Sequence, residues 1–256
     1  PGMKDLIPGQ DFSFPFLSSE FSFSKSSEEY NYDLGNEELE QKSLVATSRK
    51  DLRGHFNRFL PVILCVRVVA LYSQSMPLAI KDYYEFLRLH AYQVRLSLIE
   101  RCRAHYRHRA PYDGLPAHRS EPKTNNPSTE ESSWNRFVRY FAEVSHRPGS
   151  GGLAQLLNFI TLDSEGNVVL TSDGLKLANL KNPVLDDFEN YNREPHESPL
   201  GLEESKFIVE KIEQTHPNEY EKMGELILIL KGDGLPRGDL MERFPPLNGI
   251  SSPAKK

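Results

Sequence analysis

Residues 153–180 read LAQLLNFITLDSEGNVVLTSDGLKLANL, and this stretch decides the fold prediction for the chain. Its beginning places apolar side chains on one helical face, which predicts a short helix over Leu153–Ile160. The β-rich runs Phe159–Leu162 and Val168–Leu170 flank a turn with Gly166, which can adopt the positive φ of a hairpin turn. We therefore expect a short helix followed by a tight β-hairpin.

A second helix follows the hairpin and has clear start and stop signals. Thr171 is a good N-cap because its hydroxyl can accept a hydrogen bond from a free amide of the first turn. Asp173 places negative charge where the helix dipole favours it. Pro183 follows Asn182 and forbids continuation, so we expect this helix to end there.

The segment before the hairpin is also helical in pattern. Glu130–Val144 has amphipathic spacing, and a Pro-Gly-Ser-Gly-Gly turn at 148–152 separates it from the short helix. Residues 130–182 thus resemble the winged-helix (winged helix-turn-helix) family. In that family the hairpin is the wing, and the helix before it is often the recognition helix. The resemblance implies an architecture that holds DNA or protein; an ordinary hairpin between helices is the alternative.

Two longer helices are predicted closer to the N-terminus. Asp51–Tyr72 is apolar on most sides, as a core helix would be. Its apolar run of fourteen residues from Phe59 is too short for a bilayer, which needs about 20, so no membrane contact is expected. Leu78–Arg109 carries an apolar stripe that fits either a helical hairpin with the first helix or half of a homodimer seam. The stripe comprises Tyr84, Leu87, Ala91, Val94, Leu98, Cys102 and Tyr106.

These patterns predict a mainly α fold with a small β-hairpin. A helical N-terminal domain (51–110) precedes a Pro/Gly/Asn-rich linker (111–129) and the winged-helix-like domain (130–183). A C-terminal helical segment (184–256) follows, with helices expected at Leu202–Gln214 and Asn218–Lys231 and a loose tail.

Residues 1–50 form an arm with phenylalanines among serines and an acidic stretch behind them. The period-two spacing is typical of a strand, while Pro15 and the serine runs argue against a central one. We expect an extended segment that docks on a partner surface, with a flexible leader as the alternative. The docking residues would be Phe12, Phe14, Phe16, Phe21 and Phe23.

Charge is unevenly placed along a chain whose formal net charge is −5. Residues 88–119 hold seven arginines against two acids, a net +5, while residues 182–225 hold twelve acids against four bases, a net −8. The basic part could contact phosphates, or its arginines could complement a helix C-terminus. The candidate nucleic-acid-binding residues are Arg101, Arg103, Arg107, Arg109, Arg119, Lys123, Arg136 and Arg139.

The wing itself lacks the residues that usually contact DNA. The short helix before it offers only Gln155 and Asn158 to base edges. The hairpin tip carries Asp163 and Glu165 and no base, so it would repel phosphates. If the chain binds DNA, we therefore expect the contacts to come from the arginines that precede the wing.

We find no sequence signature of catalysis, cofactor binding or a metal site. The P-loop, dinucleotide, HExxH and GxSxG motifs are missing. Asp186, Asp187 and Glu189 are predicted to lie in a solvated loop, and Tyr83, Tyr84 and Tyr92 in the core or an interface. The chain has two cysteines, without zinc spacing or a disulfide framework, which indicates a reducing cytoplasmic environment.

The leading hypothesis is a non-enzymatic DNA-binding protein that is a subunit of a larger assembly. The rival is an adaptor that holds protein partners through its winged helix and Phe-rich arm, without nucleic acid. An enzyme would require the fold to gather carboxylates and histidines that the sequence keeps apart.

Overall fold

A computed structural model describes residues 58–73, 77–102, 114–121, 127–147, 149–186, 199–221 and 223–224. The described fold is mainly α-helical with one two-stranded antiparallel hairpin, which confirms the predicted class at that level. None of the described helices combines the length and apolar composition that crossing a membrane requires.

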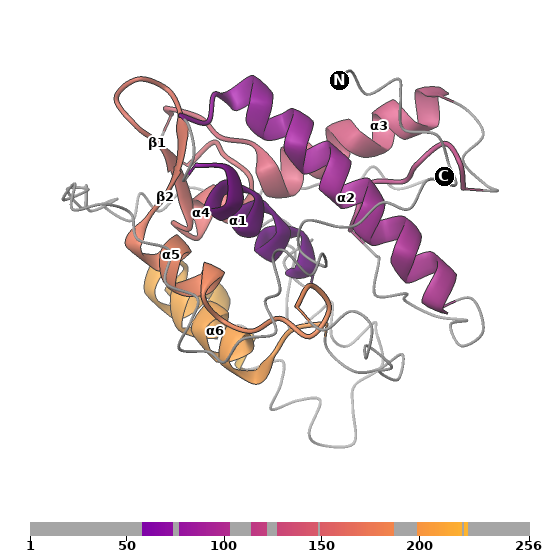
Figure 1. The fold of residues 1–256 in the computed structure, drawn as a ribbon. Helices are drawn as coiled ribbons and strands as arrows, with labels where there is room; N and C mark the ends of the chain where they lie inside the picture. Colours follow the sequence, from indigo (N-terminus) through magenta and orange to yellow (C-terminus); the bar gives the residue numbers. More distant parts are fainter. Residues whose placement is uncertain are drawn as a thin grey trace, which may run out of the picture.

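Helix α1 (Leu60–Tyr72) forms the centre of the fold because it is apolar on every side. All residues from Leu60 to Ala70 are buried. Figure 1 shows α1 between α2 and α5, and it also contacts α4, η3 and β2. The expected start at Asp51 lies outside the described residues, and within them the helix begins only at Leu60. Pro61 then falls in the first turn, where its missing N–H costs nothing.

Helix α2 (Ile80–Cys102) packs along α1 as the predicted helical hairpin. Leu87, Ala91, Val94 and Leu98 of the predicted stripe are buried, and Tyr84 is partly buried against the same core. Tyr83 and Tyr92 are buried as expected. The stripe thus packs within the chain, and its last part lies outside the described side chains.

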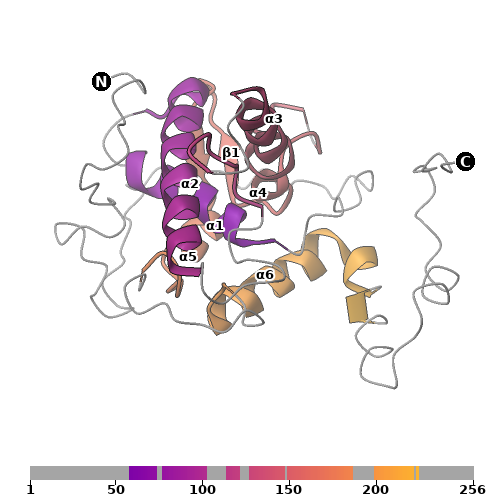
Figure 2. The same ribbon diagram turned by 90° about the vertical axis from the view of Figure 1, so that its right-hand side faces the viewer.

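Helix α3 (Pro127–Phe137) continues into a π-helical turn, η3 (Val138–Ala142), where a single α-helix over Glu130–Val144 was expected. The π-turn closes with a 2.7 Å hydrogen bond from the Glu143 amide to the Val138 carbonyl. It places Phe141 and Ala142 in the core. Figure 2 shows α3 beside α2.

Helix α4 (Leu153–Leu156) is a single turn, shorter than the expected helix to Ile160. Asn158 adopts φ 60°, a left-handed conformation that ends the helix and directs the chain into β1. Strands β1 (Ile160–Leu162) and β2 (Val168–Leu170) pair antiparallel, with Thr161 opposite Val169. The predicted hairpin is confirmed.

The hairpin turn is organised by Asp163 and Gly166. One Asp163 carboxylate oxygen accepts hydrogen bonds from the Glu165 and Asn167 amides, at 2.9 and 2.8 Å. Gly166 has φ 86°, as the turn chemistry predicted. The chain before α2 also joins this hairpin, because the Val168 amide donates to the Leu78 carbonyl at 2.8 Å.

Helix α5 (Ser172–Ala178) begins at the predicted cap: the Gly174 amide donates to the Thr171 hydroxyl at 3.0 Å. The helix ends at Ala178, with Asn179 as its C-cap, rather than at Asn182. In place of the expected last turn, the Leu180 carbonyl accepts a hydrogen bond from Arg67. The Asn182 side chain then organises a separate turn over 182–186.

Helix α6 (Leu202–Thr215) packs beside α5 and lies across the fold from α3 (Figure 2). It buries Glu204, Ile208 and Ile212. The Phe207 and Phe159 ring centroids lie 6.1 Å apart, and Lys211 forms a 2.8 Å ion pair with Asp173 of α5. Of the second expected C-terminal helix, residues 217–221 are helical and most of the rest lies outside the described residues.

One hydrophobic core includes side chains of all the described helices and of both strands. The segments on the two sides of residues 111–129 therefore share a core. The Phe-rich arm, with Phe12, Phe14, Phe16, Phe21 and Phe23, lies outside the described residues.

Candidate functional site

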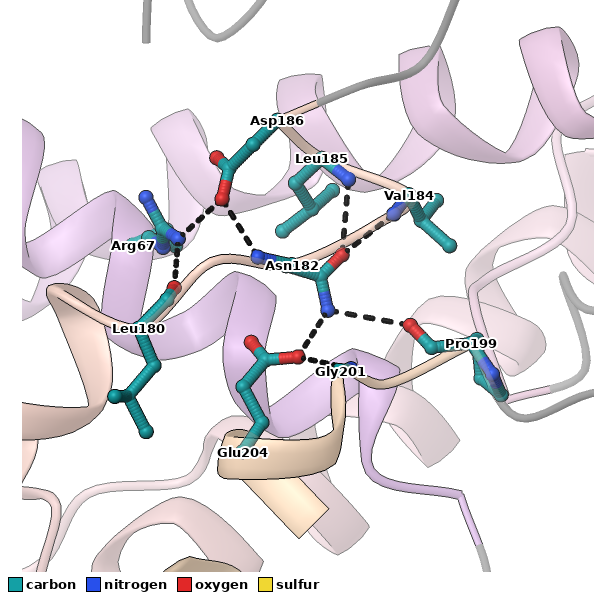
Figure 3. A network of polar contacts seen from close by, with 9 residues as sticks. All are labelled: Arg67, Leu180, Asn182, Val184, Leu185, Asp186, Pro199, Gly201 and Glu204. Atoms are coloured by element: carbon teal, nitrogen blue, oxygen red, sulfur yellow. Dashed lines mark hydrogen bonds and ion pairs between the residues drawn. The ribbon is translucent and has the colours of Figure 1, made fainter. Parts of the chain in front are cut away.

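A buried polar network joins α1 to the 182–186 turn and to α6 (Figure 3). Arg67 lies in the apolar centre of α1 with 1% of its surface exposed. Its Nη2 atom lies 2.8 Å from Oδ2 of Asp186 and 2.6 Å from the Leu180 carbonyl oxygen. We call Arg67, Asn182, Asp186 and Glu204 the Arg67 network.

Asn182 forms the middle of this network. Its Oδ1 atom accepts from the Val184 and Leu185 amides at 3.0 and 2.9 Å, which shapes the turn. Its Nδ2 atom donates to Oε2 of Glu204 at 2.8 Å. The same Glu204 oxygen accepts from the Gly201 amide at 2.8 Å, so this carboxylate also caps α6.

Burial changes the acidity of both carboxyl groups. Loss of solvent raises the pKa of Glu204 from 4.5 to about 7, partly opposed by its bonds to Gly201 and Asn182. Loss of solvent also raises the pKa of Asp186, while Arg67 acts in the opposite direction. The prediction that Asp186 lies in a solvated loop is therefore wrong, because this carboxylate is the counter-ion of a buried guanidinium. The network joins α1, the 182–186 turn and the start of α6 to one another.

A second polar cluster joins α2, residues 114–121 and α3. Arg95 contacts both carboxylate oxygens of Glu121, with Nε–Oε1 at 2.6 Å and Nη2–Oε2 at 2.8 Å. Its Nη1 atom also donates to the Leu115 carbonyl at 2.9 Å. This fork arrangement holds the 114–121 segment against α2.

Arg88 makes the corresponding contact with α3. Its guanidinium carbon lies 5.5 Å from the ring centroids of both Tyr92 and Trp134, a cation–π arrangement. Its Nη2 atom lies 3.1 Å from Glu131 and 3.5 Å from Glu130. Arg88 and Arg95 thus have carboxylate partners, and residues 88–119 present less free positive charge than their net count suggests.

The structure describes three of the predicted nucleic-acid-binding side chains, and all three are exposed. Arg136 lies in the last turn of α3, Arg139 lies in η3, and Arg119 lies in the 114–121 segment. That segment is held to α3 by a 2.8 Å hydrogen bond from the Ala117 amide to the Ser133 hydroxyl. The backbone of Arg101 lies in the last turn of α2, and Arg103, Arg107, Arg109 and Lys123 lie outside the described residues.

Residues of the hairpin region serve the fold. Gln155 of α4 donates to the Ser145 carbonyl at 2.8 Å and accepts from the Ser145 amide at 2.9 Å. Leu153 and Ala154 of the same helix are buried. Helix α4 therefore lacks the free polar surface of a helix that contacts DNA.

The part of the chain that the structure describes holds no cluster of three or more histidine, cysteine or acidic side chains suited to a metal ion. The Arg67 network was not predicted from the sequence. The one indication of it in the sequence is Arg67, an arginine inside an apolar helix. A guanidinium buried in an apolar helix requires a buried anion, but the chain has 36 acidic residues and the sequence does not show which of them is the partner.

No family model, curated protein or solved structure matches this chain.

Proposed function

We propose that this chain binds DNA without acting as an enzyme, with the phosphate backbone lying along the outer face of α3 and η3. One observation carries the proposal: Arg136 and Arg139 are both exposed and lie one turn apart on one continuous helical element.

The surroundings of these two arginines suit phosphate binding. Ser132 and Asn135 are exposed on the same side of α3 and can donate hydrogen bonds to phosphate oxygens. Arg119 is exposed on the 114–121 segment, which Ser133 holds against α3. Glu131, which would repel phosphate, is paired with Arg88.

We further propose that α3, η3, α4 and the hairpin form the winged-helix-like unit, with α3 and η3 as its DNA-facing helix. Helix α4 is one turn long and its polar side chain is used within the fold, whereas α3 with η3 presents a long polar face. The acidic hairpin would be structural. A place within a larger cytoplasmic assembly remains part of the proposal.

The proposal is tested by measuring the affinity of the full chain for a labelled DNA duplex over a salt series. Replacing Arg136 and Arg139 together with glutamine should weaken binding and reduce the slope of log affinity against log salt by about two. The matched control is Lys81→Gln with Lys176→Gln, which removes two exposed charges from α2 and α5. An absence of binding at low salt, or equal slopes in the two double variants, would refute it.

A second candidate function, protein binding, is favoured by α6. Leu202 is 71% exposed and Val209 is 40% exposed, and their spacing of two turns places them on one side of the helix. An adaptor would use this side together with the Phe-rich arm. Leu202→Gln with Val209→Gln, or deletion of residues 1–25, should then break complexes formed in cells and leave DNA affinity unchanged. Intact complexes in both variants would exclude this function.

A further inference from the structure

We propose that the docking of α6 on the 182–186 turn is a proton-dependent contact, in which Glu204 takes up a proton as α6 docks. The proposal concerns the Arg67 network and is independent of DNA binding. Through this contact, the attachment of α6 to the rest of the fold depends on pH around neutrality.

Three charged side chains of the network lie inside the protein. Arg67 has 1% of its surface exposed and Glu204 has 0%, and the Asp186 side chain is 0% exposed. Among the described residues of this network, one guanidinium faces two carboxyl groups, so full ionisation would give them a net charge of −1 in the interior. An unmatched buried charge is strongly unfavourable, and a carboxyl group can remove it by binding a proton.

The geometry identifies Glu204 as the group that binds this proton. Asp186 holds the direct ion pair with Arg67, at 2.8 Å. Glu204 instead accepts from two neutral donors, the Asn182 side chain and the Gly201 amide. Its other oxygen, Oε1, is buried and has no hydrogen-bond partner among the described residues. The carboxylate form of Glu204 is therefore the less compensated of the two anions.

The charged groups around Glu204 come from each element packed against it. Arg67 of α1 favours the ionised form and Asp186 of the turn opposes it. Lys181, just before the turn, acts on Asp186. The neighbouring charges of α6, Glu203 and Lys206, pair with each other at 2.9 Å on the exposed side.

The direction of the effect follows from the two states of Glu204. Docking raises its pKa from 4.5 to about 7, so docked α6 binds more protons than undocked α6 between these values. The docking equilibrium is strongest below pH 4.5 and weakens as pH rises through 7. With these two values the docking constant falls roughly 70-fold between pH 5 and pH 8. Release of α6 would uncover Ile208 and Ile212.

Amide hydrogen exchange on the full chain tests this proposal, since it reports α6 separately from the rest. Protection factors, corrected for the intrinsic pH dependence of exchange, are compared between α6 and α2 at pH 5 and pH 8. In the wild-type chain, α6 protection should fall by roughly 70-fold relative to α2. Glu204→Gln should abolish this fall. Glu203→Gln, an exposed neighbour with the same charge change, should retain it.

Two results would overturn the proposal: wild-type α6 protection that does not change with pH, or the same pH-dependent fall in Glu204→Gln. If Glu204→Gln does not fold, the carboxyl carbon shift of Glu204 in the wild-type chain decides the question. A midpoint near neutrality supports proton uptake on docking, and a midpoint near 4.5 contradicts it.

Discussion

Arg67 and Asp186 lie 119 positions apart in sequence, yet Nη2 of one lies 2.8 Å from Oδ2 of the other inside the core. The ion pair ties the central helix to the turn after α5, and Asn182 extends it to α6. The network therefore controls how the C-terminal part of the described fold attaches to α1.

Removing one member of this pair should be more harmful than removing both. Asp186→Leu removes the carboxylate that lies 2.8 Å from the buried Arg67 guanidinium and should lower the free energy of unfolding by about 3–5 kcal/mol. Arg67→Met combined with Asp186→Leu removes both charges and should recover part of that loss. Chemical denaturation measures both changes. A double variant less stable than Asp186→Leu would contradict this account.

Close packing at Gly174 gives the second prediction. A Cβ atom built on Gly174 would lie 1.8 Å from the Phe159 carbonyl oxygen, so any larger residue must push α5 away from the hairpin. Gly174→Ala should destabilise the chain by about 1–3 kcal/mol or more. Gly224→Ala is the control, because a Cβ there meets none of the described residues within 4 Å. Equal melting temperatures for the two variants would refute the argument.

Locally determined features were predictable from sequence. The hairpin and the Thr171 cap depend on turn and capping residues within a few positions of one another. The central place of α1 follows from a run that is apolar on every side. These features agree between prediction and structure because short-range chemistry decides them.

Features that depend on distant partners were not predictable. Arg67 needs an anion, but the sequence does not say that Asp186 provides it. The basic count over 88–119 did not reveal that Arg95 pairs with Glu121. The π-turn at Val138–Ala142 was not expected from its local sequence, and in the fold it packs against α1 and α4.

Two buried groups should give opposite pH dependences of global stability. Burial lowers the pKa of His90 from 6.5 to about 4, so its contribution to stability is present above pH 6.5 and is lost as pH falls toward 4. The contribution of Glu204 is present below pH 4.5 and is lost as pH rises toward 7. Between pH 5 and pH 8 each contribution is on the order of 2 kcal/mol, and because the two have opposite signs they partly cancel in the wild-type chain.

Single substitutions should separate these contributions. His90→Gln keeps a hydrogen-bonding group for the Tyr72 hydroxyl, which lies 2.9 Å from His90 Nε2, and the stability of this variant should fall as pH rises. Glu204→Gln should show the reverse slope. Urea denaturation at several pH values checks both, and parallel curves for the two variants would be inconsistent with the assignment.

The hairpin tip offers a test of where DNA lies. If the duplex follows α3 and η3, the hairpin has only a structural role, and an added positive charge there acts only through the net charge of the molecule. Glu165→Lys should then raise DNA affinity no more than Glu203→Lys, since both replace an exposed acid. Binding is compared at one fixed salt concentration, with a difference of less than about twofold expected. A clearly larger gain for Glu165→Lys would place the hairpin tip beside the phosphates and make the wing, rather than α3, the DNA-facing element.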